Sequence, residues 1–496
     1  MTITVQNHTT TSPTSSSLGN NNAETKLVVI YAPPGMAGHL FPTVEFGKLL
    51  VAQGLEVTVV LSAVGDADGL TNIRAANPSL SFHCLPSPVL PPANADSFEA
   101  KVFGLARASL PDLRDFLRSA SPAALVIDFF CASALEVGAE LGIPTYFFLT
   151  TCISVVAFGL CQPVMDEHTT LSFRDLGGDL VHAPGLPPIP ADHLPAFTLD
   201  RNSVSTKLFR DVPHQLCNSQ GIIVNSCRSL EPRAADAIVS GLCTPGRPTP
   251  RLYCIGPLVK PDEVGVGTER HAHECLSWLD AQPKASVVFL CFGSSGRFSA
   301  EQVKQTAAGL ETSGQRFLWV VRRLATGVEH NQSAVDELDL DTLFPTGFLH
   351  RTKERGLVVM SWAPQREVLA HGAVGGFVTH CGWNSVLEAV MAGVPMLAWP
   401  LYAEQRMNKV FLVDGMQLAV AMEGYDKPMV EAQEVAAKVR WLIESDGGRE
   451  LRQRTHAAMR VAKEALGNAG ESTRALVQLA RKWKNADQDG TCGIID

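Results

Sequence analysis

The sequence predicts an α/β protein built from two doubly wound parallel sheets. At 496 residues the chain is too long for a single core and suits two domains of about 200 to 250 residues. Short apolar runs alternate with helical patterns in both halves, which is typical of parallel strands covered by helices. Several turns that follow the apolar runs carry glycine and polar side chains, at the sheet edge where ligands of such proteins bind.

The composition excludes several classes of function. A hydrophobic content of 46% with 18% charged residues is typical of a globular protein, and the net charge of −9 argues against binding nucleic acid or an anionic membrane. The twelve cysteines are scattered, without the spacing of a zinc site, so we expect reduced thiols, no metal and a cytoplasmic location. Residues 1–24 are rich in Ser, Thr and Asn and lack the apolar segment of a signal peptide, which predicts a disordered leader.

The first domain is expected over residues 25–258. Seven apolar runs are predicted as its strands: Lys26–Tyr31, Glu56–Leu61, Leu80–Leu85, Ala124–Phe129, Thr145–Leu149, Gly221–Cys227 and Leu252–Leu258. Helices are predicted over Leu40–Gln53, Ser97–Arg118 and Ala132–Leu141. The uncharged stretch Ile143–Val164 is long enough to span a bilayer, but Pro144 and its spread polar residues favour a buried strand followed by a core helix. Asp166–Asn202 lacks periodicity and is predicted to be an excursion near the ligand site.

A linker over 259–275 is expected to lead into a second domain over 276–468. Its predicted strands are Ser286–Gly293, Arg316–Val321, Leu357–Ser361, Gly375–Thr379 and Met396–Trp399. Its predicted helices are Gln365–His371, Asn384–Ala392, Val430–Glu444 and Gly448–Ala465. A last helix within 469–486 is expected to pack back on the first domain, ahead of a tail over 487–496.

One stretch, Trp362–Gln405, carries much of the predicted chemistry. Asn384 and Ser385 are good N-cap residues, so we expect backbone N–H groups and the positive end of a helix dipole to point into a crevice. Gly382 lets the backbone approach a ligand closely, and His380 can donate to a phosphate oxygen. These features together predict a diphosphate site at this turn.

Other side chains in the same stretch suit the remaining parts of a nucleotide sugar. Glu388, one helical turn further on, can accept hydrogen bonds from two ribose hydroxyls, and Trp362 offers a flat face to a base. Glu404 and Gln405 suit the hydroxyls of a sugar. Each residue alone has a structural alternative, such as a core Trp, a simple helix cap or a packed His. Their occurrence together favours a nucleotide-sugar site.

The stretch resembles the signature box of plant secondary-product glycosyltransferases, which use UDP-sugars. It has the opening WAPQ, the turn HCGWNS and a closing Glu-Gln pair, and a looser resemblance extends from Lys26 to Trp483. The resemblance implies the GT-B fold, in which two Rossmann-like domains face one another across a cleft. It also implies that UDP-glucose is the donor, because relatives that use glucose tend to end the box in Gln, here Gln405, and galactose users in His.

Two residues of the first domain are candidates for the catalytic dyad. His39 follows the first predicted strand, and a His with an ordinary pKa near 6.5 suits a general base. Asp128 ends another apolar run, where a carboxylate needs a partner, and could orient the imidazole. A helix-end role for His39 and a capping role for Asp128 are the structural alternatives. The resemblance places the base and its supporting acid at these two positions.

The resemblance assigns further contacts with the donor. It puts Ser294 and Ser295 of a Phe-Gly-Ser-Ser-Gly turn on the donor, and Thr150, or its neighbour Thr151, on the sugar. It assigns Ala363 and Gln365 to the base and ribose, and Trp383 to the sugar together with Glu404 and Gln405. An apolar acceptor pocket is predicted from Met36, His39, Phe129, Phe130, Phe148, Ile153, Phe197 and Ala403.

The function that the residues and the family resemblance together imply is inverting transfer of glucose from UDP-glucose to a hydroxyl of a flavonoid or other small phenolic. His39 would act as the base and Asp128 would support it, giving a β-O-glucoside. A C-glycosyltransferase with the same base is the nearest alternative, because sequence does not show how the acceptor is oriented. A UDP-sugar epimerase or a non-catalytic UDP-sugar-binding protein is more remote, since neither needs the dyad. We expect a monomer without a metal.

Overall fold

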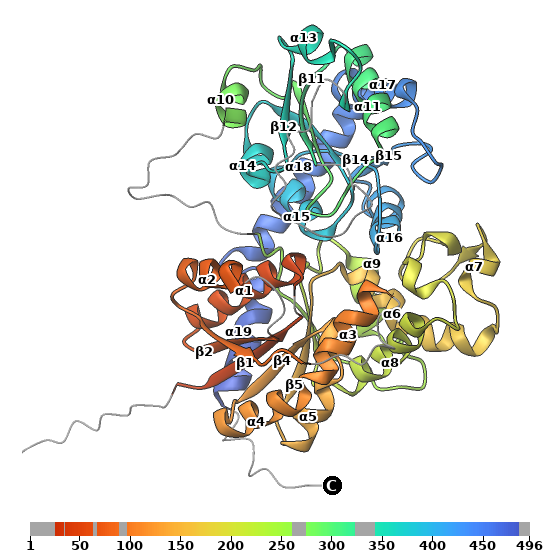
Figure 1. The fold of residues 1–496 in the computed structure, drawn as a ribbon. Coiled ribbons are helices and arrows are strands. Elements are labelled where there is room, and N and C mark those ends of the chain that lie inside the picture. The colour runs from red at the N-terminus through yellow and green to blue at the C-terminus, as the bar shows by residue number, and fades with distance from the viewer. Residues whose placement is uncertain are drawn as a thin grey trace, which may run out of the picture.

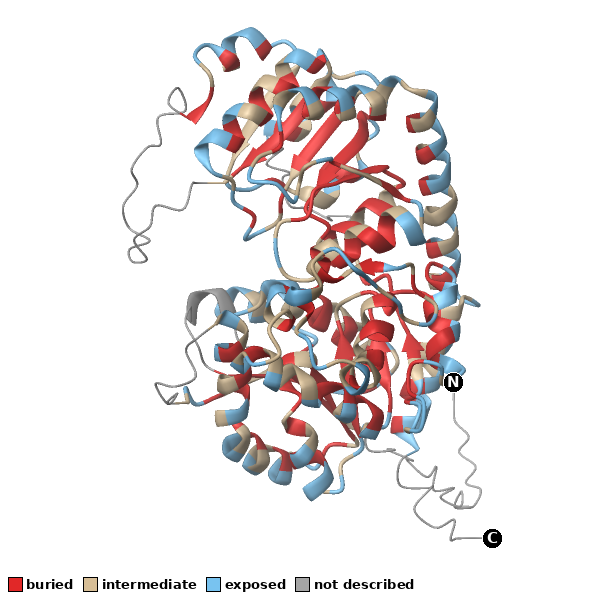
Figure 2. Cartoon of the chain, turned by 90° about the vertical axis from the view of Figure 1, so that its right-hand side faces the viewer, coloured by how far each residue is buried: buried red, intermediate tan, exposed pale blue. Residues whose placement is uncertain are grey.

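The computed structural model describes residues 25–33, 35–62, 67–88, 97–259, 274–322 and 343–485. The predicted leader over 1–24, the predicted tail over 487–496 and residues 260–273 of the predicted linker lie outside these ranges. The described chain forms two lobes, each built on a parallel sheet, as Figure 1 shows. Buried residues fill the central strands of both sheets, while exposed residues concentrate on the outer faces of the helices (Figure 2).

The N-terminal sheet has seven strands in the order β3-β2-β1-β4-β5-β8-β9, and all of its pairings are parallel. The strands are β1 (Leu27–Ala32), β2 (Glu56–Ser62), β3 (Ser81–Leu85), β4 (Ala124–Asp128), β5 (Thr145–Leu149), β8 (Ile222–Val224) and β9 (Leu252–Cys254). Each of them overlaps one of the predicted apolar runs. Helices cover both faces of the sheet, so most strand residues on either face are apolar. The order places β1 beside β4, so the sheet changes direction between them, and ligands bind at such a point.

Helices connect these strands on both sides of the sheet. They are α1 (Ala37–Ala52), α2 (Ala67–Ala76), α3 (Phe98–Ala108), α4 (Leu110–Ala120), η2 (Phe129–Cys131), α5 (Ala134–Glu140), α6 (Ile153–His168), α8 (Val204–Asn218) and α9 (Pro232–Val239). The helix predicted over Ser97–Arg118 is two helices, because Pro111 near the start of α4 has no N–H to continue the first. The helix predicted from Ala132 starts later, since the 3-10 turn η2 precedes it.

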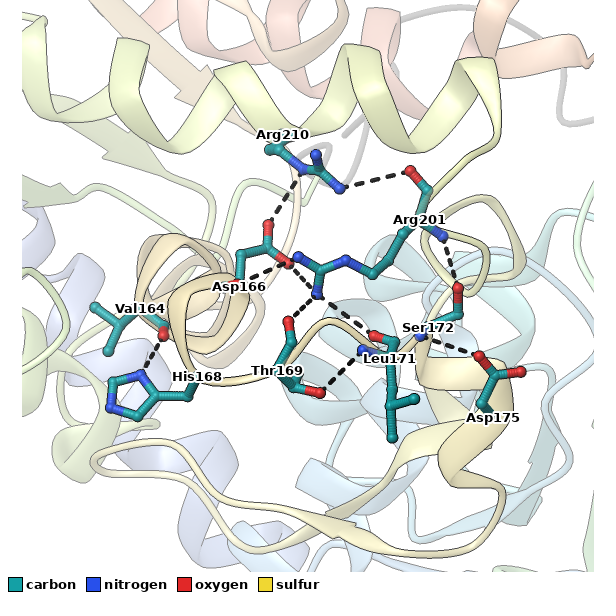
Figure 3. A network of polar contacts seen from close by, with 9 residues as sticks. All are labelled: Val164, Asp166, His168, Thr169, Leu171, Ser172, Asp175, Arg201 and Arg210. Atoms are coloured by element: carbon teal, nitrogen blue, oxygen red, sulfur yellow. Dashed lines mark hydrogen bonds and ion pairs between the residues drawn. The ribbon is translucent and has the colours of Figure 1, made fainter.

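The excursion between α6 and α8 contains α7 (Phe173–Leu176), the short strands β6 (Leu180–Val181) and β7 (Ile189–Pro190), and the 3-10 turns η3 (Ala191–His193) and η4 (Ala196–Thr198). A polar network drawn in Figure 3 holds its base. Asp166, near the end of α6, pairs with Arg201 at 3.0 Å and with Arg210 of α8 at 3.3 Å. Arg201 also donates to the carbonyl oxygen of Thr169 at 2.7 Å. The Asp166–Arg201 pair and the bonds around it therefore tie the start of the excursion to its end.

The C-terminal sheet has six parallel strands in the order β12-β11-β10-β13-β14-β15. They are β10 (Val287–Cys291), β11 (Arg316–Val321), β12 (Gly356–Met360), β13 (Val374–Thr379), β14 (Met396–Ala398) and β15 (Ala419–Ala421). The order repeats that of the first sheet, with the change of direction between β10 and β13. The three-residue strand β15 was not predicted, because so short an apolar run gives no periodic signal.

Helices also cover the C-terminal sheet. They are α10 (Glu274–Asp280), α11 (Ala300–Ser313), α13 (Phe348–Thr352), α14 (Gln365–Ala370), α15 (Trp383–Ala392), α16 (Gln405–Val410), the π-helical turn η5 (Phe411–Gly415), α17 (Ala432–Glu444) and α18 (Asp446–Leu466). The long α18 runs from the C-terminal lobe toward the N-terminal lobe (Figure 1).

The last described helix, α19 (Glu471–Lys484), lies against the N-terminal sheet (Figure 1). Its buried face includes Leu479 and Trp483, and the Trp483 ring meets the Tyr146 ring at 5.3 Å between centroids. Ser472 donates to the carbonyl oxygen of Gly256 at 2.7 Å. The chain therefore leaves the C-terminal lobe and completes the core of the first one.

The uncharged stretch that was weighed as a membrane span forms β5 and then α6, as predicted. Pro163 lies inside that helix. No helix in the described ranges has the length and apolar character needed to cross a bilayer.

Candidate active site

A cavity of about 700 Å³ lies where the two lobes meet. This volume falls in the range of small-molecule sites. Its walls come from the turns after β1, β4 and β5 of one sheet and from the turns after β10, β13 and β14 of the other. The carboxyl ends of the strands of both sheets therefore face the same cavity. In each sheet, the point where the strand order changes direction lies at its wall.

His39 and Asp128 meet at the N-terminal side of this cavity. β1 and β4 are neighbours, so the first turn of α1 lies beside the end of β4. Nδ1 of His39 is 2.8 Å from Oδ2 of Asp128, whose side chain is 2% exposed. The other oxygen of Asp128 accepts the backbone N–H of Phe130 at 2.9 Å. Asp128 thus bonds to the imidazole and also caps η2, rather than the helix predicted from Ala132, whose N-cap is Ser133.

The surroundings of His39 set the pKa of its ring and leave part of the ring exposed to the cavity. Burial lowers the pKa of His39, but the charge of Asp128, its hydrogen bond to the ring and the charge of Glu404 outweigh burial and raise the pKa above 6.5. The edge of the ring meets Phe130, with centroids 5.3 Å apart. The Thr150 hydroxyl lies 3.2 Å from Nδ1. The imidazole side chain is still 22% exposed, so a ligand in the cavity can reach it.

His380 lies across the cavity, between two glycines. A Cβ added to Gly382 would lie 2.4 Å from its Nε2, and one added to Gly293 would lie 2.5 Å from the same atom. Gly293 also has a positive φ of 73°, and its carbonyl oxygen accepts a hydrogen bond from Arg322 at 2.7 Å. Burial lowers the pKa of His380 to about 4, so the ring is neutral at ordinary pH. Its buried Nδ1 has no hydrogen-bond partner among the described residues.

Helix α15 begins earlier than predicted. Gly382 is its N-cap, while Asn384 and Ser385, which were predicted to cap it, lie in its first turn and make no capping bond. The first N–H groups of a helix lack intrahelical acceptors and carry the positive end of the helix dipole. The turn therefore still presents an anion site to the cavity, supplied by its backbone.

The polar side chains at the start of α15 are arranged by Gln365. Its Nε2 donates to Ser385 Oγ at 2.9 Å and to Glu388 Oε2 at 2.7 Å. Burial raises the pKa of Glu388, while the hydrogen bond from Gln365 opposes this shift. Three residues predicted to contact the donor thus form one connected group.

Two residues of the HCGWNS turn contact the opposite lobe. Trp383 Nε1 donates to the carbonyl oxygen of Asn225 at 2.7 Å, and Asn384 Nδ2 donates to that of Gly38 at 2.8 Å. Both residues also line the cavity. The turn that is predicted to contact the donor therefore also joins the two lobes.

The residues at the start of α16 and just before it also line the cavity. Ala403, Glu404 and Gln405 all line it, as do Ser294, Ser295 and both Thr150 and Thr151. The side-chain oxygen of Gln405 accepts the backbone N–H groups of Leu401 and Tyr402 at 2.9 and 3.0 Å. Its amide nitrogen is therefore the group left to face a ligand.

Trp362 and Ala363 lie outside the lining of this cavity, at the end of β12. The Trp362 residue is 61% exposed, which is unusual for so large an aromatic side chain. Its neighbour Ala363 is buried. The exposed indole agrees with a stacking face for a base rather than with the core-packing alternative.

Most residues predicted for the acceptor pocket line the cavity: Met36, His39, Phe129, Phe130, Phe197 and Ala403. Two predictions are wrong. Phe148 is buried on the opposite face of the sheet, stacked on Phe46 at 4.9 Å. Ile153 is buried at the start of α6, where its N–H donates to Glu231. Side chains alternate across a strand, and the sequence does not show which face meets the cavity.

Sequence reasoning missed the helical walls of the pocket. One face of α6 contributes Val155, Val156, Gly159 and Gln162, and one face of α8 contributes Phe209, Val212, Pro213 and Leu216. Their spacing of three to four residues is that of any buried helix face, so it gave no signal of a ligand. Among the described residues there is no group of three or more His, Cys, Asp or Glu that could hold a metal ion.

Comparison with known proteins agrees with this geometry. Residues 263–466 match the family model of UDP-glucoronosyl and UDP-glucosyl transferases. The chain is 45% identical to UDP-glycosyltransferase 88F3 of Pyrus communis, over 91% of this chain and 98% of that protein. It is 44% identical to phloretin 2'-O-glucosyltransferase of Malus domestica, with the same coverage.

A solved structure, that of Phytolacca americana UGT2 with UDP-2fluoro-glucose and pterostilbene, has a TM-score of 0.81 and 35% identity. The match covers 93% of this chain and 99% of that one. The two parallel sheets, of seven and six strands, are those of the GT-B fold. The chain belongs to the UDP-glycosyltransferase family of enzymes.

Proposed function

We propose that this enzyme transfers glucose from UDP-glucose to a hydroxyl of a small aromatic acceptor, with inversion, giving a β-O-glucoside. The observation that carries the proposal is the 2.8 Å contact between His39 and Asp128 at the wall of the interlobe cavity. A nucleotide-binding protein without chemistry gains nothing from an imidazole held by a buried carboxylate, whereas a base needs this arrangement.

The proposed reaction begins at the ring nitrogen that Asp128 does not hold. With Nδ1–H donating to the carboxylate, Nε2 of His39 is the free acceptor and takes the proton of the acceptor hydroxyl. The hydroxyl oxygen attacks the anomeric carbon while the bond from that carbon to the diphosphate oxygen breaks. Asp128 then stabilises the imidazolium. Attack opposite the leaving UDP converts an α-donor into a β-glycoside.

The charge that develops on the diphosphate is met by the first turn of α15. Its backbone N–H groups and the neutral His380 are donors that need no reorganisation as the bond breaks. The connected group of Gln365, Ser385 and Glu388 suits the ribose and the adjoining phosphate. Trp362, exposed beside it, provides the stacking face for uracil.

Contacts with the sugar are proposed for Glu404, Gln405 and Thr150. The amide nitrogen of Gln405 is left to donate to sugar hydroxyls, while the carboxylate of Glu404 accepts from them. A similar relative is a glucosyltransferase by name, and Phytolacca americana UGT2 was solved with UDP-2fluoro-glucose. Both support glucose as the transferred sugar.

The acceptor side of the cavity suits a flat aromatic molecule. Phe129, Phe197 and Phe209 form a continuous aromatic wall, with ring centroids 4.0 to 4.7 Å apart. The names of similar relatives include phloretin and anthocyanidin glucosyltransferases, and pterostilbene occupies the solved Phytolacca complex. These names support a phenolic acceptor.

The test is a product analysis with the purified enzyme. UDP-glucose, UDP-galactose and UDP-glucuronate are each incubated with a library of phenols, and products are identified by mass spectrometry and NMR. We expect transfer from UDP-glucose to give an acid-labile β-O-glucoside. An acid-stable product would show a carbon linkage and contradict the proposed O-transfer, and a preference for another UDP-sugar would contradict the proposed donor.

We further propose that the enzyme works as a monomer, without a metal, in the cytoplasm. Nine of the eleven free cysteines in the described part of the chain are buried, as reduced thiols are. Gel filtration with light scattering and activity in the presence of a chelator test the first two proposals. Localisation of a fluorescent fusion tests the third.

A further inference from the structure

We propose that Asn384 is a positioning residue for His39, a role that rests on the proposed function of that imidazole. Asn384 lies in the first turn of α15, in the lobe that would hold the donor. Its Nδ2 donates to the carbonyl oxygen of Gly38 at 2.8 Å, across a sequence separation of 346 residues. Gly38 is the residue immediately before His39, so this bond joins the donor-side helix to the turn that carries the base.

The turn that carries His39 is held from both lobes. From its own side it is held by the N–H of His39, which donates to Met36 at 3.0 Å, and by Thr43, which donates to the carbonyl oxygen of His39 at 2.9 Å. Gly38 is exposed and has no side chain to pack. The amide of Asn384 fixes the peptide that precedes His39 and so limits the positions open to the imidazole.

The hydrogen bonds of Asn384 leave its side chain little to offer a diphosphate. One N–H of Nδ2 donates to Gly38, and the buried Oδ1 has no partner among the described residues. An amide oxygen cannot donate to a phosphate, so only the second N–H of Nδ2 is left for one, and the UDP affinity of the Asn384 variant measures that contribution. The backbone N–H groups of the same turn remain for the anion, so one turn serves the donor through its backbone and the base through this side chain.

Ser385, the next residue, provides a matched control. Its hydroxyl accepts from Gln365 within the C-terminal lobe, and no hydrogen bond links it to the His39 turn in the described structure. A change at Ser385 therefore acts on the donor site, while a change at Asn384 also acts on the base.

The experiment compares Asn384→Ala with Ser385→Ala, using two phenols of similar shape. One phenol is protonated at the assay pH and needs the base, and the other is already ionised and does not. We expect Asn384→Ala to lower kcat about 10- to 100-fold with the protonated phenol, on the scale of a misplaced catalytic group. It should leave kcat with the ionised phenol and the affinity for UDP close to wild type. Ser385→Ala should affect both phenols equally.

A double-mutant cycle with His39→Ala gives an independent result. If Asn384 acts through the imidazole, adding Asn384→Ala to His39→Ala causes no further loss. Equal loss with both phenols, weakened UDP binding or multiplicative losses in the cycle would overturn the positioning role. Asn384→Leu, which has a similar shape, removes the donor and adds no charge beside the diphosphate, repeats the test if the alanine variant folds poorly. Full activity of His39→Ala alone would instead refute the proposed base.

Discussion

Nδ1 of His39 lies 2.8 Å from a carboxylate oxygen of Asp128, although the two residues are 89 positions apart in the chain. The contact exists because β1 and β4 are adjacent parallel strands, with Tyr31 paired opposite Ile127. The turn after one strand therefore meets the end of the other. Asp128 is held in place by the N–H of Phe130 and cannot turn away from the ring.

Asp128→Asn separates the charge of this residue from its capping bond. The amide oxygen can still accept the N–H of Phe130, so we expect the variant to fold. The pKa of His39 should fall, because the charge and hydrogen bond of Asp128 raise it against the effect of burial. In wild type the rate is lost as pH drops through this raised pKa, so in the variant that loss moves to lower pH.

The plateau rate of Asp128→Asn should also fall, by about 100- to 10,000-fold, because an amide can hold the wrong imidazole tautomer and cannot stabilise the imidazolium. A pH–rate profile of kcat/KM, with circular dichroism to confirm folding, measures both effects. An unchanged profile would show that the carboxylate does not act on the base.

Gly382→Ala tests the position of His380. The φ of Gly382 is −63°, so alanine costs no backbone strain, but its Cβ would lie 2.4 Å from Nε2 of His380. The ring must move, and the loss of one hydrogen bond to a charged group should weaken UDP binding about 10- to 100-fold. Gly372→Ala is the control, because a Cβ there meets no atom within 4 Å. Calorimetric titration with UDP measures the affinity of both variants. Equal affinities of Gly382→Ala and Gly372→Ala for UDP would contradict a contact between His380 and the diphosphate.

Gly159 on α6 allows the acceptor pocket to be narrowed without disturbing the fold. A Cβ at this position meets nothing within 4 Å, and the residue lines the cavity. Gly159→Ala should raise the unfolding free energy by about 0.5–1 kcal/mol, since alanine favours a helix interior. Gly159→Leu should raise KM for three-ring phenols more than for one-ring phenols, at unchanged UDP affinity. A uniform change across acceptors would place the acceptor elsewhere.

Much of this architecture could be predicted from the sequence. β5 and β11 have the predicted bounds, and the turn before α15 could be singled out because glycine, His and polar helix-start residues lie close together in the chain. His39 and Asp128 could be paired because doubly wound sheets bring the ends of neighbouring strands together. Local chemistry and a common strand order were sufficient for these features.

The remaining features depend on how the lobes and helices face one another. Nothing near Asn384 or Trp383 indicates that their side chains bond to Gly38 and Asn225 of the other lobe. Phe147, Phe148 and Leu149 of β5 are all apolar and all buried, so the sequence gives no alternation there to show which face meets the ligand. The walls from α6 and α8 look like ordinary core faces for the same reason.

The most direct test of the proposed mechanism is His39→Ala, measured for both turnover and UDP affinity. The base should contribute about 100- to 10,000-fold to kcat, while the donor site on the other lobe stays intact. We therefore predict a loss of turnover on that scale with a phenol protonated at the assay pH, at unchanged affinity for UDP. Turnover close to wild type with that phenol would contradict the assignment of His39 as the base.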